Sequence, residues 1–196
     1  MNDSNNQRDN FKAVILGDTG VGKTALVTRW TTGTYSSVNH PTIGANHQRK
    51  RVTIDNQEVD IFLWDTAGQE QFQALTPLYA RSSCAAILTT AINNMDSFTN
   101  IDKWIELLNT STDESPPIIL AVNKIDLETD NVMTHDKIIT DYENKFAGIF
   151  FVSAATNEGV DNLFNATAQK GFEFAKANSH KVDQPVPAEP NKKNCC

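Results

Sequence analysis

Gly17-Asp18-Thr19-Gly20-Val21-Gly22-Lys23-Thr24 is the most informative stretch of the chain, because it joins an apolar run at residues 11–16 to a helix-like segment. Its glycines allow a backbone path in which successive N–H groups, with the N-terminus of the next helix, surround an anionic phosphate chain. Lys23 supplies a mobile positive charge, and Thr24 supplies a hydroxyl ligand for Mg²⁺. The pattern therefore predicts a phosphate-binding P-loop.

Asn123-Lys124-Ile125-Asp126 indicates which nucleotide binds. It follows the apolar run at residues 118–122, at the edge where a parallel sheet presents its ligands. The carboxylate of Asp126 can accept two hydrogen bonds, from the ring N–H and the exocyclic amine of guanine, whereas adenine offers no such pair. Since an unpaired buried carboxylate is unfavourable, the motif selects guanine by exclusion as well as by attraction.

Two further motifs each follow a strand-like run. In Asp65-Thr66-Ala67-Gly68-Gln69-Glu70, we expect Asp65 to approach Mg²⁺ through water and the Gly68 N–H to approach the γ-phosphate. Gln69 can orient the attacking water. Ser153-Ala154-Ala155 is expected to close over the base with its backbone N–H groups.

These motifs occur in the order and at the spacing of the small GTPases of the Ras superfamily, which the chain resembles over residues 11–178. The resemblance implies a three-layer α/β P-loop fold, bound GTP or GDP with Mg²⁺, and slow hydrolysis of GTP. It also places Tyr35 at an edge of the guanine, and Thr42 at Mg²⁺ and the γ-phosphate.

The predicted site therefore comprises three overlapping sets of residues. The nucleotide-binding set is Asp18, Thr19, Gly20, Val21, Gly22, Lys23, Thr24, Ala25, Tyr35, Thr42, Gly68, Asn123, Lys124, Asp126, Ser153, Ala154 and Ala155. The metal set is Thr24, Thr42 and Asp65, and the catalytic set is Gln69, Lys23 and Thr42.

Within the superfamily the chain is similar to the Rab family. The resemblance rests on Thr42-Ile43-Gly44, residues 64–70, Ala74-Leu75-Thr76-Pro77-Leu78-Tyr79 and the cysteine pair Cys195-Cys196. It implies four kinds of partner: an exchange factor, a GTPase-activating protein, a prenyl-dependent escort protein or GDP-dissociation inhibitor, and effectors. It also implies the cytoplasmic face of an endomembrane, with a cytosolic GDP-bound pool. The stretches at residues 43–45 and 76–79 resemble endocytic Rabs.

The chain departs from the Rab pattern at surfaces that partners read. Asn46 and His47 stand where an acidic residue and an aromatic are usual, Gln71 replaces an arginine, and Ala80 replaces a tyrosine. Ala155 replaces the usual lysine over the base, which leaves the backbone contacts possible. We therefore expect unusual partners and ordinary nucleotide binding.

Apolar runs predict six strands, at residues 11–16, 47–54, 58–64, 84–90, 117–122 and 149–152. Asp55-Asn56-Gln57 is a predicted hairpin turn, so one strand pair is antiparallel in a mostly parallel sheet flanked by about five helices. Helical spacing predicts two buried helix faces, formed by Phe98, Ile101, Ile105 and Leu108 and by Val160, Leu163, Phe164, Ala168, Gly171, Phe172 and Ala175.

Composition divides the chain into a disordered N-terminal extension at residues 1–10, a GTPase domain at 11–178 and a flexible tether at 179–196. The 196 residues carry a net charge of −7, which favours no binding of nucleic acid, and we expect a monomer. No apolar run is long enough to cross a membrane. Cys84 lies in an apolar run and is predicted to be a reduced core residue.

Cys195 and Cys196 follow a proline-containing polar segment and resemble the doubly geranylgeranylated tail of Rabs. Two prenyl chains hold a protein on a membrane stably, whereas one gives only marginal residence. The predicted function is thus a membrane-tethered GTP/GDP switch that recruits effectors for vesicle trafficking. Two alternatives stay open: a GTP-loaded scaffold that does not hydrolyse, and an ATP-dependent P-loop phosphotransferase.

Overall fold

A six-stranded sheet runs through the part of the chain that the computed structural model describes, residues 9–37, 42, 45–66, 75–127 and 134–178. The strand order is β2-β3-β1-β4-β5-β6, and only the β2–β3 pair of this sheet is antiparallel. The strands are β1 Asp9–Leu16, β2 Ala45–Ile54, β3 Gln57–Thr66, β4 Ala85–Ala91, β5 Ile118–Asn123 and β6 Gly148–Phe151. The predicted sheet is confirmed.

The central strands are apolar along their whole length because helices cover both of their faces. All seven residues of β4 are buried. β1 begins at Asp9 rather than at residue 11, so residues 9 and 10 belong to the sheet and not to the predicted N-terminal extension. The extension was predicted too long because Asp9 and Asn10 are polar, and an apolar run does not reveal a strand end that is held by backbone pairing with β3.

The β2–β3 hairpin turns at Asp55 and Asn56, as predicted. Both residues have positive φ angles, 49° and 62°, which is the conformation of a two-residue type I′ turn. Asp and Asn tolerate this left-handed conformation better than most residues do. The turn therefore sets the antiparallel register in which Ile54 faces Gln57.

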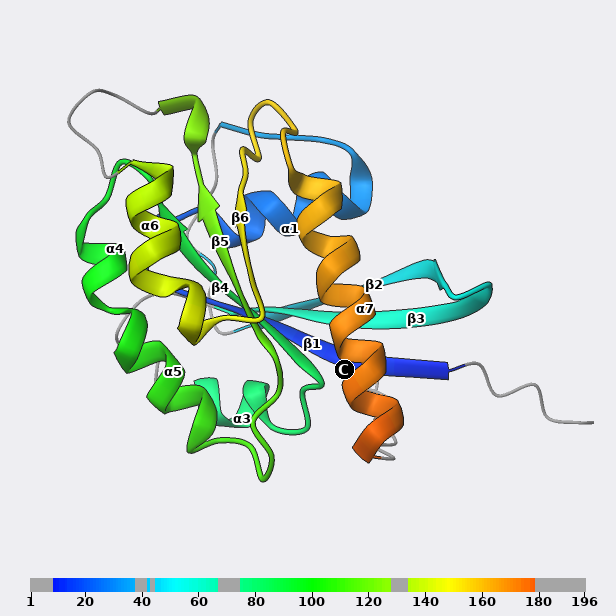
Figure 1. Ribbon diagram of the computed structural model, residues 1–196. Coiled ribbons are helices and arrows are strands. Elements are labelled where there is room, and N and C mark those ends of the chain that lie inside the picture. The colour runs from blue at the N-terminus through cyan, green and yellow to red at the C-terminus, as the bar shows by residue number, and fades with distance from the viewer. Residues whose placement is uncertain (1–8, 38–41, 43–44, 67–74, 128–133, 179–196) are drawn as a thin grey trace, which may run out of the picture.

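The helices lie on the two faces of the sheet (Figure 1). Their bounds are α1 Lys23–Thr32, α3 Thr76–Ala80, α4 Asp96–Thr99, α5 Ile101–Asn109, α6 His135–Tyr142 and α7 Val160–Asn178, with short 3₁₀ turns η1 Ile125–Leu127 and η2 Glu143–Lys145. Residues of α1 and α7 share one core cluster with the sheet, and residues of α3, α4, α5 and α6 share the other. The two clusters make the structure a three-layer sandwich.

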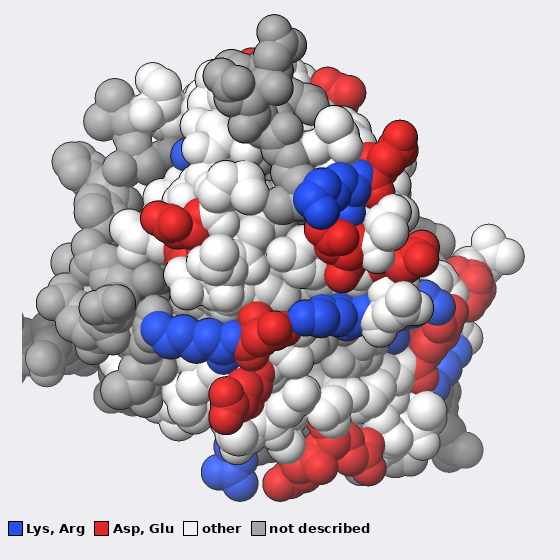
Figure 2. Space-filling model, turned by 60° about the vertical axis from the view of Figure 1, so that its left-hand side comes forward, with Lys and Arg blue, Asp and Glu red and all other residues white. Residues whose placement is uncertain are grey.

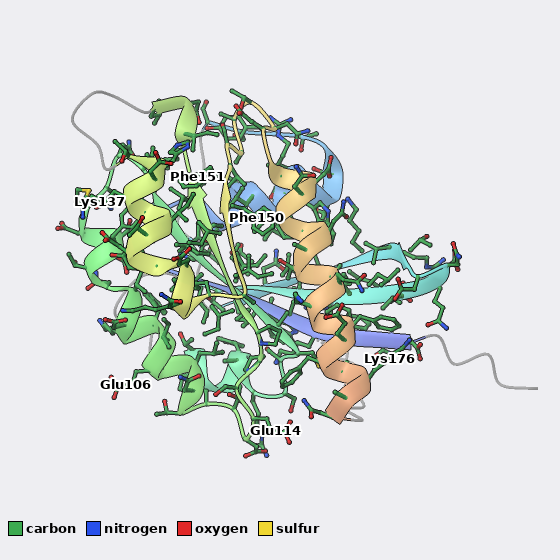
Figure 3. All side chains as sticks on the ribbon, viewed as in Figure 1. Glu106, Glu114, Lys137, Phe150, Phe151 and Lys176 are labelled. Atoms are coloured by element: carbon green, nitrogen blue, oxygen red, sulfur yellow. The ribbon has the colours of Figure 1, made fainter. Side chains whose placement is uncertain are left out.

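Successive side chains along a strand point to opposite faces of the sheet, so they pack into different core clusters. Phe150 and Phe151, labelled on β6 in Figure 3, are neighbours in the chain but pack against opposite core clusters. On the α1–α7 side, the rings of Trp30 and Phe164 stack with centroids 4.3 Å apart. Cys84 is a buried free cysteine of this cluster, as predicted, and burial raises the pKa of its thiol to about 11.

The surface on the α5–α6 side mixes charges of both signs. Figure 2 shows basic and acidic side chains of the described residues interspersed over the face that it presents. α6 carries the ion pair between Lys137 and Asp141, at 2.9 Å, and Lys145 pairs with Asp102 of α5 at 2.6 Å. Exposed pairs of this kind contribute little to stability. Among the helices of the described ranges, none has the length and apolar character of a membrane span.

Candidate nucleotide-binding site

A cavity of about 360 Å³ opens where the strands β1, β3, β5 and β6 end, which is the edge at which α/β sheets bind ligands. Its volume is in the range of small-molecule sites. The residues that line it are Thr19, Gly20, Gly22, Lys23, Thr24, Ala25, Tyr35, Ser37, Thr42, Thr66, Asn123, Lys124, Asp126, Leu127, Ala154 and Ala155. Most of the predicted nucleotide-binding residues therefore meet at one cavity.

The P-loop can form only with glycine at Gly17 and Gly22. Both have positive φ angles, 133° and 100°. A Cβ on Gly17 would lie 2.2 Å from the carbonyl oxygen of Thr89, and a Cβ on Gly22 would lie 2.3 Å from Nδ2 of Asn123. The loop is thus packed directly against the ends of β4 and β5, with no room for a side chain.

Lys23, the first residue of α1, is buried beneath this loop. Its Nζ donates hydrogen bonds to the carbonyl oxygens of Gly17 and Asp18, each at 2.8 Å. Burial lowers the pKa of Lys23 to about 8, while Asp65 and Asp18 act in the opposite direction. A phosphate group in the cavity would stabilise the charged amine, because its negative charge would compensate for the hydration that the amine has lost on burial.

Three of the predicted oxygen ligands lie together beside Lys23. Oγ1 of Thr24 donates a hydrogen bond to Oδ2 of Asp65 at 2.7 Å and lies 2.8 Å from Oγ1 of Thr42. Asp65 is only 2% exposed, and its Oδ1 is buried without a hydrogen-bond partner among the described residues. Burial raises the pKa of Asp65, against the effects of Thr24 and Lys23. Hydroxyl and carboxylate oxygens with an unsatisfied acceptor fit Mg²⁺, which prefers oxygen ligands.

The base end of the cavity is braced by two buried polar side chains. Asn123 donates from Nδ2 to the carbonyl oxygen of Val21 at 2.8 Å and accepts at Oδ1 from the N–H of Ala154 at 3.2 Å. Ser153, fully buried, donates from Oγ to Oδ1 of Asp126 at 2.6 Å. These bonds hold the Asp126 carboxylate and the Ala154 backbone at the cavity, so Ser153 acts on Asp126 and does not line the cavity itself.

The side chain of Asp18, a member of the predicted nucleotide-binding set, does not line the cavity and is held by Asn100, just before α5, and by Trp104 of α5. Oδ2 accepts from Nδ2 of Asn100 and Oδ1 accepts from Nε1 of Trp104, both at 2.8 Å. Sequence reasoning missed Asn100 and Trp104. A signal existed for Trp104, since a tryptophan on the buried face of a helix needs an acceptor for its indole N–H. Val21 is likewise buried away from the cavity surface.

Several predicted residues lie outside the described part of the chain: Gly68, Gln69, Cys195 and Cys196. The structure also adds three lining residues that were not predicted, namely Ser37, Thr66 and Leu127. Thr66 donates from Oγ1 to the carbonyl oxygen of Ile15 at 2.8 Å, which ties the end of β3 to β1. Thr66 lies inside the motif at residues 65–70 and Leu127 directly follows Asp126, but neither was given a role in the predicted chemistry, and Ser37 lies in no predicted motif.

Comparisons with known proteins agree with this geometry. The model of the Ras family matches residues 12–173. The mouse protein named Ras-related protein Rab-22A is 33% identical over 200 residues, covering 95% of this chain and 97% of that protein. The dog protein named Ras-related protein Rab-21 is 34% identical over 166 residues, covering 85% of this chain and 74% of that protein.

Proposed function

The chain belongs to the Ras family of small GTPases as a divergent Rab-type member, and we propose that it hydrolyses GTP slowly to switch off the recruitment of effectors to a membrane. Family membership supports the GTP/GDP switch itself. The observation that carries the proposal is the convergence of Thr24, Thr42 and Asp65 beside the buried amine of Lys23.

At the phosphate end, the backbone of the P-loop and Lys23 would bind the β- and γ-phosphates. Thr24 and Thr42 would hold Mg²⁺, with Asp65 reaching it through water, and the ion would neutralise charge on the phosphates. Gln69, outside the described residues, would orient the water that attacks the γ-phosphate in line. Loss of that phosphate would remove the partner of Thr42 and release its segment.

At the base end, Asp126 would accept the two N–H hydrogens of guanine, with its carboxylate oriented by Ser153. Because none of the predicted catalytic residues is an arginine finger, rapid hydrolysis would need an activating protein, which is worth about 10³–10⁵ in rate for such enzymes. We further propose an exchange factor, an escort protein or GDP-dissociation inhibitor, and geranylgeranyl groups on Cys195 and Cys196 as the membrane anchor. The stretch at residues 43–45 favours an endosomal membrane.

Nucleotide binding and single-turnover hydrolysis test the proposal. The purified protein should bind GDP and GTP far more tightly than ADP and ATP, and should release phosphate from bound GTP in the presence of Mg²⁺. Preference for ATP would favour a phosphotransferase instead. Tight binding of GTP with no phosphate release over many hours would favour a scaffold that does not hydrolyse.

A further inference from the structure

Arg29, in the last turn of α1, connects the residues that directly follow this helix to residues 154–155, which are more than a hundred positions away. Its guanidinium donates from Nε to the carbonyl oxygen of Ala154 at 2.8 Å and from Nη2 to that of Ala155 at 2.9 Å. Nη1 donates to the carbonyl oxygen of Gly33 at 2.8 Å. The Cζ atom also lies 5.6 Å from the ring centroid of Tyr35, within the range of a cation–π contact.

Apart from Gly33, the residues that Arg29 contacts in this way line the cavity, although Arg29 itself does not. Ala154, Ala155 and Tyr35 are all lining residues. Ala154 is held from both sides, since Asn123 accepts from its N–H and Arg29 donates to its carbonyl oxygen. Ala155 has only a methyl group, so its segment is positioned through the backbone rather than through a long side chain over the base.

We propose that Arg29 is a positioning residue for guanine recognition, which holds the Ala154–Ala155 backbone and the Tyr35 ring at two walls of the base pocket. This inference rests on the proposed function of the cavity. A planar guanidinium can donate to two neighbouring carbonyl groups at once, which a lysine ammonium does with poorer geometry. Walls that are already ordered bind a ligand more tightly, because less conformational freedom is lost on binding.

The position of Arg29 on α1 also couples the two ends of the cavity. Lys23 begins the helix beneath the P-loop, and Arg29 lies about 9 Å further along the axis at the helical rise of 1.5 Å per residue. One rigid element therefore sets the separation between the phosphate-binding amine and the base walls. Displacement of Tyr35 or of the Ala154–Ala155 segment would loosen the pocket without altering the P-loop.

Dissociation of a fluorescent GDP analogue tests the proposal, with the full-length protein and its Arg29→Ala, Arg29→Lys, Tyr35→Leu and Arg29→Ala/Tyr35→Leu variants. We expect Arg29→Ala to release the nucleotide about tenfold faster, the effect of losing charge-assisted hydrogen bonds. The release rate of Arg29→Lys should lie between that of the wild type and that of Arg29→Ala. If Arg29 and Tyr35 act together, the increase in release rate of the double variant should be smaller than the product of the increases of the two single variants. Arg49→Ala is the matched control, because Arg49 pairs with Asp60 on the β2–β3 hairpin, and it should release GDP at the wild-type rate.

Each result bears on the proposal. A wild-type rate in folded Arg29→Ala, full rescue by Arg29→Lys, or effects of Arg29 and Tyr35 that multiply independently would overturn the clamp. Should Arg29→Ala fail to fold, Arg29→Lys with faster release than wild type would support it, and Arg29→Lys at the wild-type rate would overturn it. Failure of the wild-type protein to bind GDP at all would instead overturn the proposed function.

Discussion

Thr24 shows how much one side chain contributes to the site, since its hydroxyl contacts both Asp65 and Thr42. The three groups come from α1, the end of β3 and the segment before β2, so the cluster exists only when all three elements are in place. In this structure, hydrogen bonds join the side-chain oxygens of Thr24, Thr42 and Asp65 that would surround Mg²⁺. Substitution of Thr24 should therefore weaken the binding of GTP, which carries a γ-phosphate, more than the binding of GDP.

Thr24→Asn should weaken GTP binding more than GDP binding, because the longer amide would displace the hydroxyl that would hold Mg²⁺, and the charge of this ion matters most when the γ-phosphate is present. Titration of both nucleotides with and without Mg²⁺ measures the ratio. Thr140→Asn, an exposed change on α6, is a control that should leave the ratio unaltered. An equal loss of affinity for GTP and for GDP would contradict the assignment of Thr24 to the metal site.

Asp126→Asn should weaken guanine nucleotides and improve the relative affinity for xanthine nucleotides, because the amide can donate to the carbonyl that replaces the amine of guanine. Competition between GDP and xanthosine diphosphate measures this change. Asp141→Asn, which alters a surface ion pair of α6, is the matched control. A variant with no relative gain for xanthine would show that Asp126 does not contact the base.

Among the elements, α7 is fitted most closely to the sheet. Gly171 lies where a Cβ would be 2.4 Å from Cε2 of Phe11 and 3.1 Å from the Cβ of Ala85. Phe11 is completely buried in β1, so its ring has little freedom to move. The glycine is therefore required by close packing of the helix on the strand and not by its backbone conformation.

Gly171→Ala should lower the free energy of unfolding, although the same change in an exposed helix raises it. Overpacking costs about 1–3 kcal/mol and the gain in helix propensity is about 0.5–1 kcal/mol, so the net effect is destabilising. Urea unfolding measures it. Asn165→Ala, on the exposed side of α7, should be neutral or stabilising, and equal behaviour of the two variants would contradict the packing explanation.

At the scale of the whole molecule, the burial of Lys12 makes the free energy of unfolding depend on pH. Lys12 lies in β1, with Nζ 4.7 Å from the ring centroid of Trp64 and donating to the carbonyl oxygen of Arg81 at 2.9 Å. Burial lowers the pKa of Lys12 from 10.5 to about 8, against a smaller effect of Cys84. Below pH 8 the folded state thus holds a charged amine that would be better solvated in the unfolded chain.

The sign of the pH effect follows from proton binding. Between pH 8 and 10.5 the unfolded chain binds more protons at Lys12 than the folded chain does, so this group adds stability as the pH rises. Lys12→Met removes the group and should be more stable than wild type at pH 7, by about 1 kcal/mol after allowance for solvent screening. The difference should shrink towards pH 9. Urea unfolding at several pH values tests this, with exposed Lys103→Met as the control; a difference that does not vary with pH would contradict it.

The proposed membrane attachment involves residues 195–196, far along the chain from the P-loop, and it should be separable from nucleotide binding. Changing Cys195 and Cys196 together to Ser should release the protein into the soluble fraction, since each buried CH₂ of a prenyl chain contributes about 0.8 kcal/mol. Single substitutions should leave partial, exchangeable attachment. Membrane fractionation and mass spectrometry of the C-terminal peptide measure both; an unmodified wild-type peptide would contradict the proposed anchor.

Contiguous patterns were enough to predict the sheet, the hairpin turn and the P-loop. Each depends on neighbours in the chain: apolar runs make buried strands, Asp55-Asn56 supplies two left-handed residues, and the glycines of residues 17–22 supply room for a phosphate. Sequence spacing also predicted most lining residues of the cavity, because parallel strands bring their carboxyl ends to one edge.

Long-range contacts between side chains could not be predicted in this way. The Asp18 carboxylate accepts a hydrogen bond from the indole of Trp104, and Arg29 reaches carbonyl groups more than a hundred residues away, at Ala154 and Ala155. No period or motif encodes such pairs, because each depends on which elements lie side by side and on the rotamer that packing leaves open. Local spacing therefore specified which chemical groups reach the nucleotide site, and tertiary packing specified which of them face the cavity and which hold the others in place.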